Sequence, residues 1–108
     1  MSPTARTLKY YRNLGYYIEV VERYNHFTKK RNDFCGFCDM IAIKDQETVC
    51  VQATTVGHIP DHQRKIEASL NLPLLKKANW TITLIGWGKY KLKRGGKAVR
   101  WRERIINL

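Results

Sequence analysis

The chain has 108 residues, and 20 lysines and arginines against 9 aspartates and glutamates give it a formal net charge of +11. The length favours one domain over residues 1–108 and argues against a large cofactor-filled cleft, and no apolar run reaches the roughly 18 residues of a membrane-spanning helix. The start of the chain lacks a signal-peptide pattern and three cysteines are too few for a disulfide framework, so we expect a cytoplasmic protein with no membrane contact, whose positive field attracts a polyanion such as nucleic acid.

The first half of the chain carries the patterns of one helix and three strands. The helix is short and basic, with cations at near-helical spacing and a glycine just past its end. β-branched and aromatic residues favour the strands, and the turn sequence KDQE separates the second from the third. The expected elements are a helix at 4–13, strands at 16–24, 38–43 and 48–54, and a polar, basic loop at 25–33.

The second half predicts two helices, a strand and a hairpin. In the first helix, Ile66 and Leu70 are expected to face the core, and a proline favours the start of the second. The tail should turn back at its Gly-Gly pair. The expected elements are helices at 61–70 and 71–77, a strand at 79–87, and a hairpin within 89–105.

Cations alternate with apolar residues along this C-terminal hairpin. A period of two would place the cations together on one face, as a ribbon that could follow a phosphate backbone, and such binding should weaken steeply with salt. Protection of a sheet edge is the alternative explanation. The expected nucleic-acid contacts are Lys89, Lys91, Lys93, Arg100, Arg102 and Arg104 on the hairpin, with Lys30, Arg31 and Arg64 elsewhere.

The stretch NDFCGFCDMIAIKD contains a Cys-x-x-Cys pair, Cys35 and Cys38. Redox chemistry needs a helix at the first cysteine, whereas a β-branched strand follows here, and the two flanking aspartates disfavour a thiolate. His58 and His62 could complete a zinc site with the pair, although the gap between the halves exceeds that of an ordinary zinc finger. We expect Cys38 and Cys50 to be small buried residues of a sheet, with a zinc-stabilised binding domain as the alternative.

The aspartate that follows the cysteine pair, Asp39, is a candidate ligand for a cation. A two-residue turn within KDQE would pair Lys44 with Glu47, and the same register places Asp39 directly opposite Gln52, with Thr54 on the same face. Opposed side chains have Cβ atoms about 5 Å apart, so a carboxylate and an amide oxygen could meet one cation. A hydrated sheet end is the alternative.

The order of these elements, with an aspartate on the second core strand, resembles the PD-(D/E)XK nuclease superfamily. The stretch GFCDMIAIKDQETVCVQAT, followed by HQRKIEASL and LLKKANWTITLIGW, is most similar to its VRR-NUC and Holliday-junction-resolvase-like branches, which include small phage members. The resemblance covers residues 15–87. It implies an α/β (α+β) fold with a restriction-endonuclease-like αβββαβ core, in which helices flank a mixed central sheet, here followed by a basic β-hairpin.

The resemblance also implies a metal-dependent DNA endonuclease. Asp39 and Gln52 would bind a magnesium or manganese ion that activates water for phosphodiester hydrolysis, and either Glu22 or Glu19 would complete the shell. Branched DNA as substrate and a two-fold homodimer are further expectations.

This chain departs from the family motif at one position. Where the motif has an acid, any residue and a lysine, the chain has Gln52, Ala53 and Thr54. A threonine cannot supply the positive charge that supports the transition state. Either Lys65 or, as a second choice, Arg64 replaces the lysine from the next helix, or the protein is a catalytically inactive nucleic-acid-binding module on the same fold.

Overall fold

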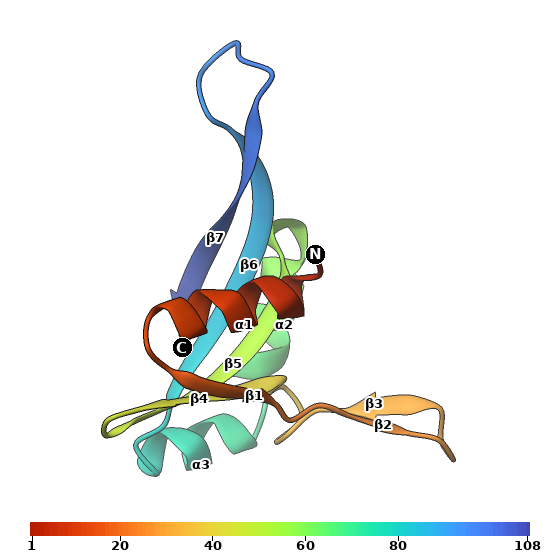
Figure 1. Cartoon of the computed structure of the whole chain (residues 1–108). Helices are drawn as coiled ribbons and strands as arrows, with labels where there is room; N and C mark the ends of the chain where they lie inside the picture. Colours follow the sequence, from red (N-terminus) through yellow and green to blue (C-terminus); the bar gives the residue numbers. More distant parts are fainter.

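The computed structural model describes all 108 residues as a five-stranded mixed sheet with helices on both faces, which confirms the expected mixed α/β fold (Figure 1). No helix is both long and apolar enough to cross a lipid bilayer. The helices are α1 (Pro3–Asn13), α2 (Ile59–Glu67) and α3 (Asn71–Lys77), with the 3-10 turn η1 (Val56–His58) before α2. The strands are β1 (Tyr17–Val20), β2 (Arg23–Asn25), β3 (Lys30–Asn32), β4 (Met40–Lys44), β5 (Glu47–Thr55), β6 (Thr81–Lys91) and β7 (Val99–Asn107).

The sheet has the strand order β1-β4-β5-β6-β7. β5 and β6 are parallel, and the other neighbouring strands are antiparallel. Parallel neighbours need a long crossover connection, which η1, α2 and α3 provide between β5 and β6. Between β4 and β5, Asp45 adopts a positive φ of 53°, a conformation that aspartate tolerates in tight hairpin turns. This turn pairs Lys44 with Glu47, which confirms the expected register.

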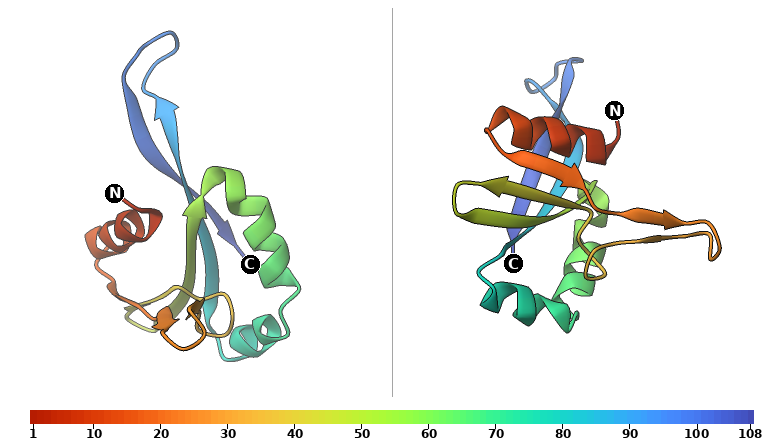
Figure 2. Two further views of the ribbon diagram at one scale, coloured as in Figure 1. Left: turned by 90° about the vertical axis from the view of Figure 1, so that its right-hand side faces the viewer. Right: turned by 60° about the horizontal axis from the view of Figure 1, so that its bottom comes forward.

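Two hydrophobic clusters hold the helices against opposite faces of the sheet. In Figure 2, α1 covers one face, and α2 and α3 cover the other. The α1 side includes Trp87, whose Nε1 donates to Thr7 Oγ1 at 2.9 Å, and Tyr11. The α2 side includes Ile66 and Leu75. Because side chains alternate along β5, its residues on the face of Cys50 point towards α2.

The expected first strand and the loop after it have a different structure. We predicted one strand over 16–24 and a loop over 25–33, but pairing with β4 stops at Val20. The backbone N–H groups of Val21 and Glu22 both donate to the Asp39 carbonyl, at 2.8 and 3.2 Å, and this turns the chain away from the sheet. Residues 23–32 then form a separate antiparallel hairpin of β2 and β3, here called the β2–β3 finger.

One expected core residue lies at the surface. Leu70 is 90% exposed, because α2 ends at Glu67 and does not extend to residue 70 as predicted. The backbone N–H of Ser69 bonds to the carbonyl of Ile66, and α3 then starts at Asn71. The helical period that would carry Leu70 to the core is therefore interrupted.

The C-terminal hairpin separates the two kinds of cation. β6 continues past the core into the hairpin, where Lys89 pairs with Trp101 and Tyr90 pairs with Arg100. Directly opposed residues of antiparallel strands share a face, so the lysines of β6 and the arginines of β7 lie on opposite faces. The prediction of a single cationic face is therefore wrong: Lys89 and Lys91 lie on one side, Arg100, Arg102 and Arg104 on the other, and Lys93 lies beyond the strand.

The lysine face of the hairpin adjoins α1. Arg6 and Lys89 lie over the ring of Trp101, with 4.0 and 5.4 Å between the cation and the ring centroid. The arginine face adjoins η1 and α2, since a Cβ at Gly88, the partner of Arg102, would meet Val56. Each face of the hairpin therefore borders a different helical layer.

Close packing at Gly86 positions α2, and Gly86→Ala tests it. An added Cβ would lie only 2.6 Å from Ile59 Cγ1, so we expect the free energy of unfolding to fall by about 1–3 kcal/mol, measured by urea denaturation. The double variant with Ile59→Ala should lose less than the sum of the two single changes. Gly57→Ala is the matched control, because its Cβ would enter open space. Additive losses would show that this contact does not position the helix.

Candidate functional site

The backbone of Asp39 joins three segments of the chain. Its N–H donates to the carbonyl of Val51 in β5 at 3.0 Å, while its own carbonyl accepts from Val21 and Glu22 just before the β2–β3 finger. β4 begins at the next residue. The Asp39 side chain therefore starts from a fixed point where β4, β5 and the base of the finger meet.

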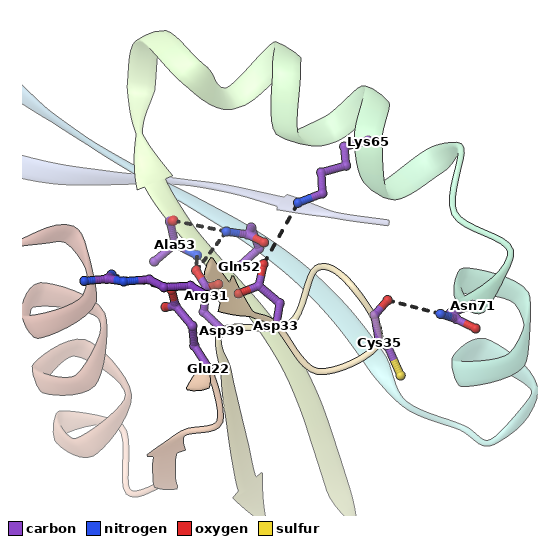
Figure 3. Close-up of polar contacts among 9 residues, drawn as sticks. All are labelled: Glu22, Arg31, Asp33, Cys35, Asp39, Gln52, Ala53, Lys65 and Asn71. Carbon is purple, nitrogen blue, oxygen red and sulfur yellow. Dashed lines mark hydrogen bonds and ion pairs between the residues drawn. The ribbon is translucent and has the colours of Figure 1, made fainter. Parts of the chain in front are cut away.

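The side chain of Asp39 meets Gln52, as the hairpin register predicts. Asp39 Oδ2 accepts from Gln52 Nε2 at 2.8 Å and from the N–H of Ala53 at 3.2 Å (Figure 3). Both side chains are nearly buried, with 7% of Asp39 and 5% of Gln52 exposed. Gln52 Oε1 is buried without any hydrogen-bond partner. A buried acceptor without a partner costs about 1–3 kcal/mol, and rotation of the Gln52 amide would turn this oxygen towards Asp39.

Two further carboxylates join Asp39. Carboxylate oxygens of Glu22, Asp33 and Asp39 all lie within 4.8 Å of one another, and we call this group the acidic cluster. Glu22 directly precedes the β2–β3 finger and Asp33 directly follows it, so the finger's pairing brings the two residues together at its base. Local hairpin geometry therefore supplies two of the three carboxylates.

Cations flank the acidic cluster on two sides. Arg31, on β3, lies 3.5 Å from Glu22, and Lys65, on α2, lies 4.0 Å from Asp33 (Figure 3). Both cationic side chains are largely exposed, and exposed pairs of this kind contribute at most about 1 kcal/mol. They reduce the repulsion between the carboxylates without neutralising the cluster.

Burial and crowding perturb the titration of the site. Burial, followed by the negative charge of Asp33, raises the pKa of Asp39 to about 7, and the hydrogen bond from Ala53 opposes this shift. His62, on α2, has its pKa lowered, first by burial and then by Lys65 and His58. The lowered pKa favours the uncharged form of the His62 imidazole.

The acidic cluster lies in an open cleft of about 410 Å³. The N-terminus of α1, the end of β5, and the start of α2 form its walls, and the base of the β2–β3 finger closes it. Ten of its twelve lining residues have polar or charged side chains. The lining residues are Pro3, Thr4, Glu22, Arg31, Asp33, Asp39, Gln52, Ala53, Thr54, Thr55, His58 and His62.

Most residues predicted for the site are brought together. Asp39, Gln52 and Glu22 lie in or beside the acidic cluster, and Lys65 approaches it through Asp33. Glu19 does not join them, because it points to Tyr17 on the exposed part of β1. Of the other cations, Arg31 reaches the cluster, whereas Lys30 is exposed on the finger and Arg64 pairs with Asp61 at the surface.

Asp33 is the site residue that the sequence patterns do not indicate. They give it only as one of the two aspartates that flank the cysteine pair. Pairing of the segments on either side of HFTK places Asp33 opposite Glu22, but the polar, basic composition of residues 25–33 predicts a loop.

The cysteine and histidine pairs are not gathered into one site. Cys38 and Cys50 are fully buried on the α2 side of the sheet, as expected, and Cys38 Sγ donates to the carbonyl of Met40 at 3.0 Å. His58 and His62 instead line the cleft. No three of the four predicted zinc ligands, which include Cys35, come within metal-ligand distance of one another.

The donor set of the cluster suits a hard divalent cation. Carboxylate and amide oxygens are the ligands that magnesium and manganese prefer, and adjacent ligands of an octahedral magnesium ion lie about 2.9 Å apart. Rotating the Gln52 amide would exchange Nε2 for Oε1, 2.8 Å from Asp39 Oδ2. Comparisons of the chain with protein-family models, curated proteins and solved structures gave no match, so the case for the site rests on these residues.

The raised pKa of Asp39 predicts how stability depends on pH. The folded chain holds the Asp39 proton more tightly than the unfolded chain does. In the presence of a metal chelator, the free energy of unfolding should therefore fall as the pH rises from about 4 to about 7. A shift of this size corresponds to at most about 4 kcal/mol. Urea denaturation across this range should show a smaller fall for Asp39→Asn, which should also be more stable than wild type at pH 8.

Asp61→Asn is the control for this measurement, because Asp61 is an exposed aspartate outside the cluster. Its pH dependence should match that of wild type. If Asp39→Asn had the same pH dependence as wild type, the pKa of Asp39 would not be raised in the folded chain.

Proposed function

We propose that this chain is a metal-dependent nuclease that hydrolyses phosphodiester bonds in DNA. The observation that carries the proposal is the acidic cluster, three carboxylates within 4.8 Å on a chain of net charge +11. The overall field attracts a polyanion, whereas the cluster itself would repel a phosphate. A divalent cation between cluster and phosphate resolves this conflict.

The resemblance to the PD-(D/E)XK superfamily supports the same assignment. Asp39 stands at the position of the family's aspartate and Gln52 at its second ligand, and the two side chains are in contact. The order of core elements, α1, β1, β4, β5, α2 and β6, agrees with the αβββαβ pattern. Branched DNA, a two-fold homodimer and a cytoplasmic location belong to the proposal, the last because all three cysteines are free.

Each group in the cleft has a separate task in this proposal. Asp39, Gln52, Asp33 and Glu22 would hold a magnesium or manganese ion, which would supply the positive charge that polarises the phosphodiester and activates water for the attack. Lys65 places a positive charge beside Asp33. This charge would stabilise the negative charge that develops on the phosphate in the transition state.

Asp39→Asn tests the metal-dependent reaction. We expect cleavage of branched and linear DNA in magnesium to fall by about a hundredfold or more, because the variant keeps the shape of the side chain and loses its charge. DNA binding should persist, since the basic surfaces are unchanged. Gel assays with end-labelled DNA measure cleavage, and Asp61→Asn should cut like wild type. Equal activity of Asp39→Asn and wild type would refute the assignment.

Lys65→Ala tests whether α2 supplies the missing positive charge. We expect the cleavage rate to fall at least about tenfold with little change in DNA affinity, because a single exposed cation contributes little to binding. Arg64→Ala is the matched control, since the neighbouring Arg64 pairs with Asp61 away from the cluster. Equal rates for the two variants would exclude Lys65 from the reaction.

A catalytically inactive DNA-binding module is the second candidate. It is favoured by Thr54, which lines the cleft where the family has its lysine, and by the exposure of Lys65, whose side chain is 57% accessible. On this alternative the wild-type protein binds DNA and cuts none in magnesium or manganese.

A further inference from the structure

The β2–β3 finger projects from the body of the protein (Figure 1, Figure 2). Its turn, between the paired residues Asn25 and Lys30, carries an exposed aromatic residue. Phe27 is 99% exposed, more than any other large apolar residue of the chain. Residues 23–32 also contain four cations and no acidic residue. The finger therefore presents an apolar ring together with four positive charges, a combination that matches the flat bases and anionic phosphates of a nucleic acid.

The tip is held in one conformation. Asn25 Oδ1 accepts from the backbone N–H groups of Phe27 at 2.9 Å and Thr28 at 3.2 Å. Tyr24 and His26 pack edge to face with their ring centroids 5.0 Å apart. Because these contacts fix the backbone of the turn, a partner that binds Phe27 would have to order only its side chain.

The finger is attached directly to the acidic cluster. It begins after Glu22 and ends before Asp33, and its own Arg31 contacts Glu22. At about 3.3 Å per residue, the five residue steps from Glu22 to Phe27 span at most about 17 Å, the length of roughly five base-pair steps of a duplex. A DNA that has a phosphate at the cluster and runs along the finger would therefore come within reach of Phe27.

We propose that Phe27 stacks on a base of the bound DNA while Lys29 and Lys30 contact the phosphates beside it. The partner is taken from the proposed function, but the contact does not require that the DNA be cut. A nucleobase offers the flat apolar face that Phe27 matches, and the phosphates match the adjacent lysines. Bases at a branch point are more accessible than bases in a continuous duplex, so the finger favours branched DNA.

Phe27→Ala tests this contact. In EDTA, where cleavage is blocked, we measure binding of a four-way DNA junction with 2-aminopurine at the branch point. We expect about tenfold weaker binding, the effect of losing one stacked base, and loss of the 2-aminopurine fluorescence change that wild type produces. The salt dependence of binding should stay the same, because the phosphate contacts remain. Phe27→Trp should keep both the affinity and the fluorescence change.

Leu70→Ala is the matched control, because Leu70 is similarly exposed but lies outside the finger. If Phe27→Ala matches wild type in affinity and fluorescence, the inference is overturned while the nuclease proposal stands. A Phe27-dependent signal from a protein that never cuts DNA would support the inference and overturn the nuclease. If Phe27 is needed only for binding to phosphatidylserine vesicles, the finger contacts lipid and the inference is overturned.

Discussion

The site depends on the two backbone groups of Asp39. The N–H group bonds to β5, and the carbonyl accepts two N–H groups from the segment that leaves β1, so one residue fixes where the sheet ends and where the β2–β3 finger begins. Its side chain then accepts two more hydrogen bonds from Gln52 and Ala53. The same contacts that end the regular sheet therefore create the point at which three carboxylates meet.

The acidic cluster concentrates negative charge at one place in a basic protein. Two of its carboxylates have an exposed cation beside them, and Asp39 has hydrogen bonds but no close positive partner. Gln52 contributes a donor to Asp39 and leaves its own oxygen unsatisfied. A chain selected only for stability would replace these groups, and strained arrangements of this kind are typical of sites that a ligand completes.

Local patterns in the sequence predict the hairpin of β4 and β5 well, and with it the contact between Asp39 and Gln52. The KDQE turn fixes that register within a few residues. Local patterns do not predict the β2–β3 finger, because its three-residue strands are polar and its start depends on hydrogen bonds to the distant Asp39. For a similar reason, local patterns predict the wrong faces for the cations of the C-terminal hairpin. Alternation gives the faces of each strand separately, but the pairing register decides whether they coincide.

The C-terminal hairpin is consequently a two-sided arm, with lysines towards α1 and arginines towards α2. β6 runs without a break from the core into this arm, so its length can change without any change in the core. Adding one residue to each strand would exchange the sides of every cation further out. Adding two would restore them and extend the arm by about 7 Å. The arm can therefore lengthen only in steps of two residues per strand if its lysines and arginines are to stay on their separate faces.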